Sequence, residues 1–221
     1  MTRLARVVVA GLPHHVTQRG NGRRRVFFSD ADYALYRDLL AESCRAAGVE
    51  CWAHVLMPTH VHLILVPSDA DGLRAALAPT HRAYAGLINA RRRKSGHFWQ
   101  GRFGAVAMDE THLAAALRHV LLNPVRARLV KKAVDWRWSS ARAYLRGKDD
   151  GLTLTAPLLH RFPDMADLLK GAADTAAEKR LRRAETIGRP VGNAAFMKRL
   201  EKLTHRTLTA GKPGRKPRKK N

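Results

Sequence analysis

The chain has 221 residues and a formal net charge of +23, from 41 lysines and arginines against 18 aspartates and glutamates. So basic a surface favours polyanionic partners, with nucleic acid ahead of an anionic membrane surface. No stretch approaches the roughly 20 apolar residues of a membrane span, which excludes a spanning protein. Cys44 and Cys51 are too few for a disulfide framework or a thiolate zinc site. We therefore expect a cytoplasmic, nucleoid-associated protein.

The length suits one core domain with an appendage better than two full domains. We expect a core domain over residues 1–147, a helical extension over 148–210 and a basic disordered tail over 211–221. The extension shows helical spacing of apolar residues around 163–185 and 193–204. The tail holds six cations among prolines and glycines, which is typical of a segment that binds backbone phosphates non-specifically.

Periodicity and turn signals predict alternating strands and helices in the core domain. Strands are expected at 14–19, 49–57, 60–66 and 103–108, and helices at 31–47, 71–94 and 110–122. Pro79 should restart the second helix, and Pro124 should end the third near Asn123. This order predicts an α+β fold with a ferredoxin-like antiparallel sheet and helices on one face.

The strand at 60–66 carries His60 and His62 within an apolar run. Because side chains alternate along a strand, both imidazoles should point to one face and Val61 to the other. Two imidazoles at this spacing are suited to clamping a metal ion, although two surface histidines on a half-exposed strand would give the same pattern.

A second pair of polar residues lies on the helix predicted at 110–122. His119 and Asn123 are four residues apart, opposite the apolar face, so they can point into one site. This placement argues against a buried core position for His119, and a plain exposed histidine is the alternative.

Basic and aromatic side chains gather in several segments. Residues 95–103 interleave aromatics, cations and glycines, which is typical of a surface that stacks unpaired bases; a packed loop is the alternative. We expect DNA contacts from Arg19, Arg23, Arg24, Arg25, Arg91, Arg92, Arg93, Trp99, Gln100, Arg102 and Arg126, and from Lys212, Arg215, Lys216 and Arg218 in the tail.

Three motifs occur in the order LMPTHVH at 56–62, FWQGRF at 98–103 and LNPVRA at 122–127. With these motifs the chain resembles the REP-associated tyrosine transposases, which belong with the small insertion-sequence transposases to the HUH single-strand endonucleases. The resemblance covers roughly residues 5–147.

The resemblance implies a transposase that binds hairpin-containing single-stranded DNA and cleaves and rejoins it. The implied ligands of one divalent cation, Mg²⁺ or Mn²⁺, are His60, His62 and Asn123, and the cation polarises the scissile phosphate. In the family a tyrosine attacks phosphorus and leaves a 5′-phosphotyrosine link and a free 3′-OH. Whether such a protein works as a monomer or a homodimer is left open by the sequence.

The chain departs from the family at the nucleophile, because His119 occupies the tyrosine's position four residues before Asn123. Three alternatives follow. The protein has lost nicking and only binds DNA; His119 attacks phosphorus or activates water; or a displaced tyrosine, Tyr84 or Tyr144, reaches the site. His119 could also serve as a third imidazole ligand.

Three classes of function compete. The first is a transposase-like enzyme, which the three convergent ligands favour. The second is a catalytically impaired DNA-binding protein of the same fold, which His119 favours. The third is an RNA-binding ferredoxin-like module, although such readers display aromatics on their central strands and the strand at 60–66 has none.

Overall fold

The computed structural model describes residues 6–170 and 175–208. Its centre is a four-stranded sheet in the order β2-β3-β1-β4, with every neighbouring pair antiparallel. The strands are β1 (His14–Arg19), β2 (Val49–Met57), β3 (His60–Pro67) and β4 (Gly104–Ala107). This confirms the predicted α+β class and antiparallel sheet. The tail residues Lys212, Arg215, Lys216 and Arg218 lie outside the described residues.

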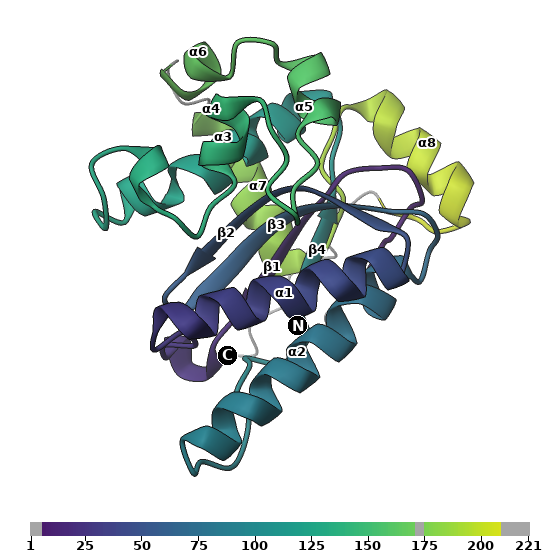
Figure 1. Ribbon diagram of the computed structural model, residues 1–221. Coiled ribbons are helices and arrows are strands. Elements are labelled where there is room, and N and C mark those ends of the chain that lie inside the picture. Colours follow the sequence, from purple (N-terminus) through teal and green to yellow (C-terminus); the bar gives the residue numbers. More distant parts are fainter. Residues whose placement is uncertain (1–5, 171–174, 209–221) are drawn as a thin grey trace, which may run out of the picture.

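Helices cover both faces of the sheet (Figure 1). Helices α1 (Asp30–Ala46) and α2 (Gly72–Arg91) pack on the face to which Val61 points. Helices α3 (Glu110–Arg126) and α7 (Thr175–Ile187) pack on the other. The prediction placed helices on one face only; the opposite face is covered as well because Ile64 and its neighbours make it apolar too. With neither face open, the sheet offers no surface of the kind that RNA readers use.

The described part of the C-terminal extension shares the core of the sheet. Its remaining helices are α5 (Ala156–Arg161), α6 (Met165–Lys170) and α8 (Ala194–Thr204), preceded by α4 (Ala141–Arg146) and short 3₁₀ turns at Asn21–Arg23 and Ala133–Asp135. Leu181 and Ala184 of α7 are buried in the same apolar cluster as Ile64. Residues Val191 and Met108 form a β-bridge beside β4. Among the described helices, none is long and apolar enough to cross a membrane.

Two prolines lie inside helices that they were expected to interrupt. Pro79 is within α2, which continues through it because the buried positions Leu77 and Tyr84 on either side hold the helix against α1. Pro124 is within α3, whose last turn continues to Arg126 and is closed by a hydrogen bond from the Ala127 amide to the Asn123 carbonyl. Tertiary packing offsets the hydrogen bond that each proline cannot donate.

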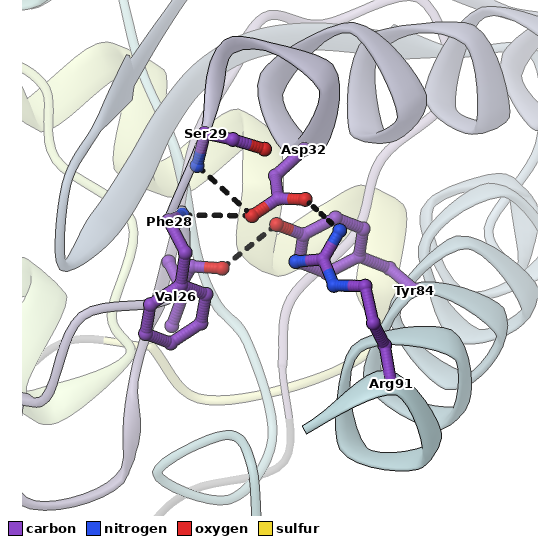
Figure 2. Close-up of polar contacts among 6 residues, drawn as sticks. All are labelled: Val26, Phe28, Ser29, Asp32, Tyr84 and Arg91. Carbon is purple, nitrogen blue, oxygen red and sulfur yellow. Dashed lines mark hydrogen bonds and ion pairs between the residues drawn. The ribbon is translucent and has the colours of Figure 1, made fainter.

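A buried carboxylate ties the start of α1 to the end of α2 (Figure 2). Asp32 is 0% exposed and accepts hydrogen bonds from the backbone amides of Phe28 and Ser29 and from the Arg91 guanidinium at 2.6 Å. Beside it the Tyr84 hydroxyl donates to the Val26 carbonyl. Burial alone would raise the pKa of Asp32, but these bonds, that from Arg91 foremost, hold it below its ordinary value.

Replacing Asp32 with alanine should lower the free energy of unfolding by about 3 kcal/mol, because the substitution removes two hydrogen bonds from backbone amides at the start of α1 and an ion pair whose carboxylate is buried. Because the folded-state pKa of Asp32 is lowered, the ionised carboxylate contributes its full stability above the ordinary pKa of 3.8. This contribution is lost as the pH falls through the lower folded-state pKa. Urea unfolding at pH 7 and at low pH measures both effects. Asp38→Ala, on the exposed side of the same helix, is the control and should change stability by less than about 0.5 kcal/mol. Equal effects of the two variants would contradict the account.

Candidate active site

Strands β1 and β3 bring three histidines to the sheet face covered by α3 and α7. In the register, Thr17 lies opposite His62 and Arg19 opposite His60. His15, two residues before Thr17, therefore shares the face of the β3 histidines and sits diagonally from His62. Its Nε2 lies 3.0 Å from His62 Nδ1, and the His60 and His62 rings are 4.9 Å apart. The prediction that His60 and His62 share one face is confirmed.

Helix α3 adds His119 and Asn123 to this group. The His119 ring centre lies 5.0 Å from that of His62. The Asn123 amide nitrogen lies 3.4 Å from His119 Nε2, so the predicted i, i+4 contact exists, and Arg126 lies 3.4 Å from His119 Nδ1. Against expectation His119 is buried, at 8% exposed. Helix α7 packs across this face of α3, and the local spacing in α3 carried no information about that contact.

Helix α7 contributes Glu185, whose Oε1 lies 3.0 Å from His15 Nδ1. This residue comes from the C-terminal extension and was not among the predicted site residues, and neither was His15. The alternation of His15, Thr17 and Arg19 on the first strand was a usable signal for His15. For Glu185 the sequence has none, since it is one carboxylate on a charged helix.

Burial holds His60, His62 and His119 neutral. Burial lowers the pKa of His60 to about 4, helped by the charge of Arg19. Burial and then the neighbouring His15 lower the pKa of His119 to about 4, and the same two causes keep the pKa of His62 well below its usual range. Neutral imidazoles keep a lone pair at pH 7, which a metal ligand requires.

The donor set fits a divalent cation. Among the described residues, His15, His62 and Glu185 each offer a ligand atom, and these atoms all lie within 4.8 Å of one another. His60 adds a fourth side chain beside His62, whereas the Asn123 amide is directed at His119. His15 Nδ1 and Glu185 Oε1 are buried without an aligned hydrogen-bond partner in the described part of the chain. Such groups are typical of a metal site or its supporting shell.

The buried histidines elsewhere in the chain have structural partners. His14 Nδ1 lies 2.7 Å from the Leu12 carbonyl, His54 contacts Thr153, His81 contacts the Tyr36 hydroxyl, and His112 contacts Asp109. These four histidines lie away from the cluster and each has its own polar partner. The histidines on β1, β3 and α3 instead converge on one another.

None of the four tyrosines is placed at the cluster. The Tyr84 hydroxyl donates to Val26 in the core beneath α1 and α2, on the opposite face of the sheet. The Tyr144 hydroxyl donates to the Trp52 carbonyl, five residues along β2 from the partner of His60. Burial raises the pKa of both, and Tyr33 and Tyr36 are core residues, as predicted. The arrangement gives no support to a displaced tyrosine.

The side chains that were predicted to contact DNA are mostly exposed, and some of them also contact other residues of the chain. Arg19 is exposed beside His60, and Arg23, Arg24, Arg25, Arg92, Arg93, Gln100 and Arg102 are exposed on the loops around it. Arg91 is engaged with Asp32, although half of its side chain is exposed, and Arg126 forms an ion pair with Glu178. Arg92 also lies 3.7 Å over the Phe28 ring.

The aromatic loop at 95–103 is packed against the core. Trp99 donates from its indole to the His81 carbonyl, and its ring contacts those of His81, Tyr84 and Phe98. Backbone bonds from Gln100 to Arg19 and from Asn21 to Phe98 fix the loop to the end of β1. The structure therefore matches the packed-loop alternative for Trp99, while Gln100 and Arg102 remain on the surface.

Comparison with known proteins gives a family for this architecture. A solved structure of a REP-associated tyrosine transposase bound to a REP hairpin is similar with a TM-score of 0.58 at 21% identity, over 70% of this chain and 92% of that one. A transposase candidate from Deinococcus radiodurans is similar over 55% of this chain and 97% of its own, at 22% identity and a TM-score of 0.39, which is too low to inform the fold. The comparison with curated proteins gave no match. The family model described as "Transposase IS200 like" matches residues 8–120, and the chain therefore belongs to the IS200-like transposase family.

Proposed function

We propose that this chain binds hairpin-containing single-stranded DNA and cleaves it beside the hairpin by metal-assisted phosphoryl transfer. The observation that carries the proposal is the convergence of His15, His60, His62 and His119 with Asn123 and Glu185 on one sheet face. Burying so many polar rings costs free energy, and the cluster occupies the same sheet face as the apolar core beneath α3 and α7. A catalytic centre accounts for that cost.

His60 and His62 would hold the cation, with Asn123 as the third ligand. It supplies Lewis-acid polarisation of the scissile phosphate when bound. Imidazole-rich sites suit Mn²⁺ better than Mg²⁺ by ligand softness, and both ions fit the family. Arg19, exposed opposite His60 in the register, is placed to hold the phosphate that enters this site.

The attacking group is His119, since no tyrosine is available. A lone pair of its imidazole ring forms a bond to phosphorus, the bond from phosphorus to the 3′-oxygen breaks, and that oxygen takes a proton from water to become a free 3′-OH. Arg126, 3.4 Å from His119 Nδ1, positions the ring. Attack by a 3′-OH on the phosphorus–nitrogen bond then rejoins the strand and frees the imidazole.

The DNA partner is supported by charge and by the solved relative. The net charge is +23, and exposed arginines surround the end of the sheet that carries His60. The REP hairpin belongs to the relative of similar fold; for this chain a DNA hairpin is our proposal.

The test is a denaturing gel of a 5′- or 3′-end-labelled single-stranded oligonucleotide with a hairpin, incubated with the protein and Mn²⁺. We expect a nicked strand with protein attached, lost on addition of EDTA and absent with a fully paired duplex. Peptide mapping should place the attachment on His119. A nick without attached protein would replace His119 with water as the attacking group, and binding without any nick would overturn the proposal.

A DNA-binding protein without chemistry is the second candidate. It is favoured by the four tyrosines, which are buried away from the cluster, and by α7, which packs over the α3 face of the site. This candidate predicts hairpin binding that does not respond to Mn²⁺ and no strand break under any metal.

Deleting residues 211–221 should flatten the salt dependence of DNA binding. The slope of log affinity against log salt falls by about 0.7 for each single-strand phosphate that the protein no longer neutralises, and the deletion removes six cations. Titrations of DNA binding between about 50 and 200 mM salt measure the slope. An unchanged slope would show that the tail makes no phosphate contact.

A further inference from the structure

Glu185, His15 and His62 form a continuous line from α7 to the metal-facing strand. The Glu185 carboxylate is 3.0 Å from His15 Nδ1, and His15 Nε2 is 3.0 Å from His62 Nδ1. Both His15 and His62 are buried, at 0% and 4% exposed. Glu185 Oε1 and His15 Nδ1 are buried without an aligned hydrogen-bond partner in the described part of the chain. Their 3.0 Å contact therefore brings together two groups that are otherwise unsatisfied.

The rings of His15 and His62 lie in nearly parallel planes with their nitrogens facing. The planes differ by 3°, the ring centres are 5.1 Å apart and the facing nitrogens are 3.0 Å apart. Because each nitrogen lies roughly a bond length from its ring centre, this separation means that the nitrogens point at each other. That is the geometry of an N–H···N hydrogen bond. Two nitrogens sharing one metal ion would instead aim at a point off the line between them.

The proton positions along this line follow from the carboxylate. An ionised carboxylate only accepts hydrogen bonds, so a His15 ring with a single proton carries it on Nδ1, the nitrogen that faces Glu185. His15 Nε2 then has a lone pair and must accept from His62 Nδ1–H. His62 is left with its lone pair on Nε2, which is the nitrogen available to a cation.

We propose that Glu185 and His15 are positioning residues that fix the tautomer of His62, so that its Nε2 is presented as a metal ligand. The inference rests on the proposed function and gives the C-terminal extension a role in it. A metal-binding histidine generally donates its other N–H to such a partner, and loss of the partner costs about 10–100-fold in metal affinity. Here the partner is a second histidine backed by a carboxylate from a helix 123 residues further along the chain than His62.

The first test needs neither DNA nor activity. Long-range ¹H–¹⁵N correlation spectra of the metal-free, full-length protein report which nitrogen of each histidine carries the proton. We expect His62 in the Nδ1–H form in the native chain and as a mixture of tautomers in Glu185→Ala. A native His62 in the Nε2–H form would overturn the proposal outright, whether or not any variant folds.

The second test is the Mn²⁺ affinity of the same proteins by calorimetry. Glu185→Ala should bind Mn²⁺ about 10–100-fold more weakly, and His15→Phe should do the same. Glu178→Ala removes a carboxylate from the same helix that pairs with Arg126 instead, and it should leave the affinity unchanged. Unchanged affinity in a folded Glu185→Ala protein contradicts the inference, as does a His60→Ala protein that keeps full affinity, because His15 and Glu185 would then be the ligands.

The two proposals fail separately. If the native protein never cleaves DNA but shows the Nδ1–H tautomer and the weakened Mn²⁺ binding of Glu185→Ala, only the cleavage proposal is overturned. If it cleaves while neither readout responds to Glu185, only the positioning role is overturned.

Discussion

Replacing His60 or His62 with alanine is expected to lower Mn²⁺-dependent cleavage of the hairpin oligonucleotide by about 10³-fold, with DNA affinity roughly unchanged. Loss of one of two imidazole ligands removes several kcal/mol of electrostatic stabilisation of the transition state, and about 4 kcal/mol corresponds to this factor. Affinity should persist because the exposed arginines that we propose to contact phosphates lie outside the cluster. Initial rates from gels and affinities from fluorescence anisotropy separate the two effects.

His160→Ala is the matched control, since His160 is exposed on α5. It should retain full cleavage and affinity. If the His60 and His62 variants lose DNA affinity as well as cleavage while remaining folded, the two histidines hold the DNA-binding surface together and do not form a metal centre. Full cleavage in both variants would remove the metal centre from this strand altogether.

Replacing His119 with tyrosine should give a covalent protein–DNA adduct that survives acid. A phosphorus–nitrogen link is acid-labile, whereas a phosphotyrosine link is stable, so the same gel run after mild acid treatment distinguishes the two nucleophiles. The substitution places a phenol beside His62, where the rings of residues 62 and 119 are 5.0 Å apart, and introduces the residue that the resemblance to tyrosine transposases implies at this position. The native adduct should disappear on acid treatment and the variant adduct should remain.

His119→Phe keeps a ring at this position without a nucleophile and is the control. It should bind DNA and form no adduct. An adduct in His119→Phe would show that another side chain attacks. Absence of any adduct in a folded His119→Tyr protein would mean that the approach of DNA to position 119 is blocked, as the cover of α7 over this face would suggest.

Local patterns predicted most of the fold. Strands β1 and β2 have the predicted bounds, and β3 and α1 differ from the prediction by one residue at most at each end. These bounds could be predicted because turn residues at Gly20, Gly48 and Pro58 separate segments with a clear periodicity of apolar residues. The expected effects of Pro79 and Pro124 on their helices were wrong, since the penalty at each proline is offset by packing that only the folded chain displays.

Only some of the site residues could be predicted from the sequence, for the same reason. His60 with His62, and His119 with Asn123, are pairs whose spacing on one element predicts a shared direction. His15 and Glu185 join them across 170 residues of sequence, and no local period encodes such a contact. The burial of His119 likewise depends on α7, which is far from α3 in the sequence. The spacing of residues in α3 gives no information about this packing.

Anomalous diffraction from a crystal grown with Mn²⁺ can show whether the β3 histidines hold a divalent cation, as we propose. We expect one strong peak at bonding distance from His60 and His62 Nε2, with His15 and Glu185 outside the coordination sphere. A peak enclosed by His15, His62 and Glu185, or no peak on this face of the sheet at saturating Mn²⁺, would contradict the proposal.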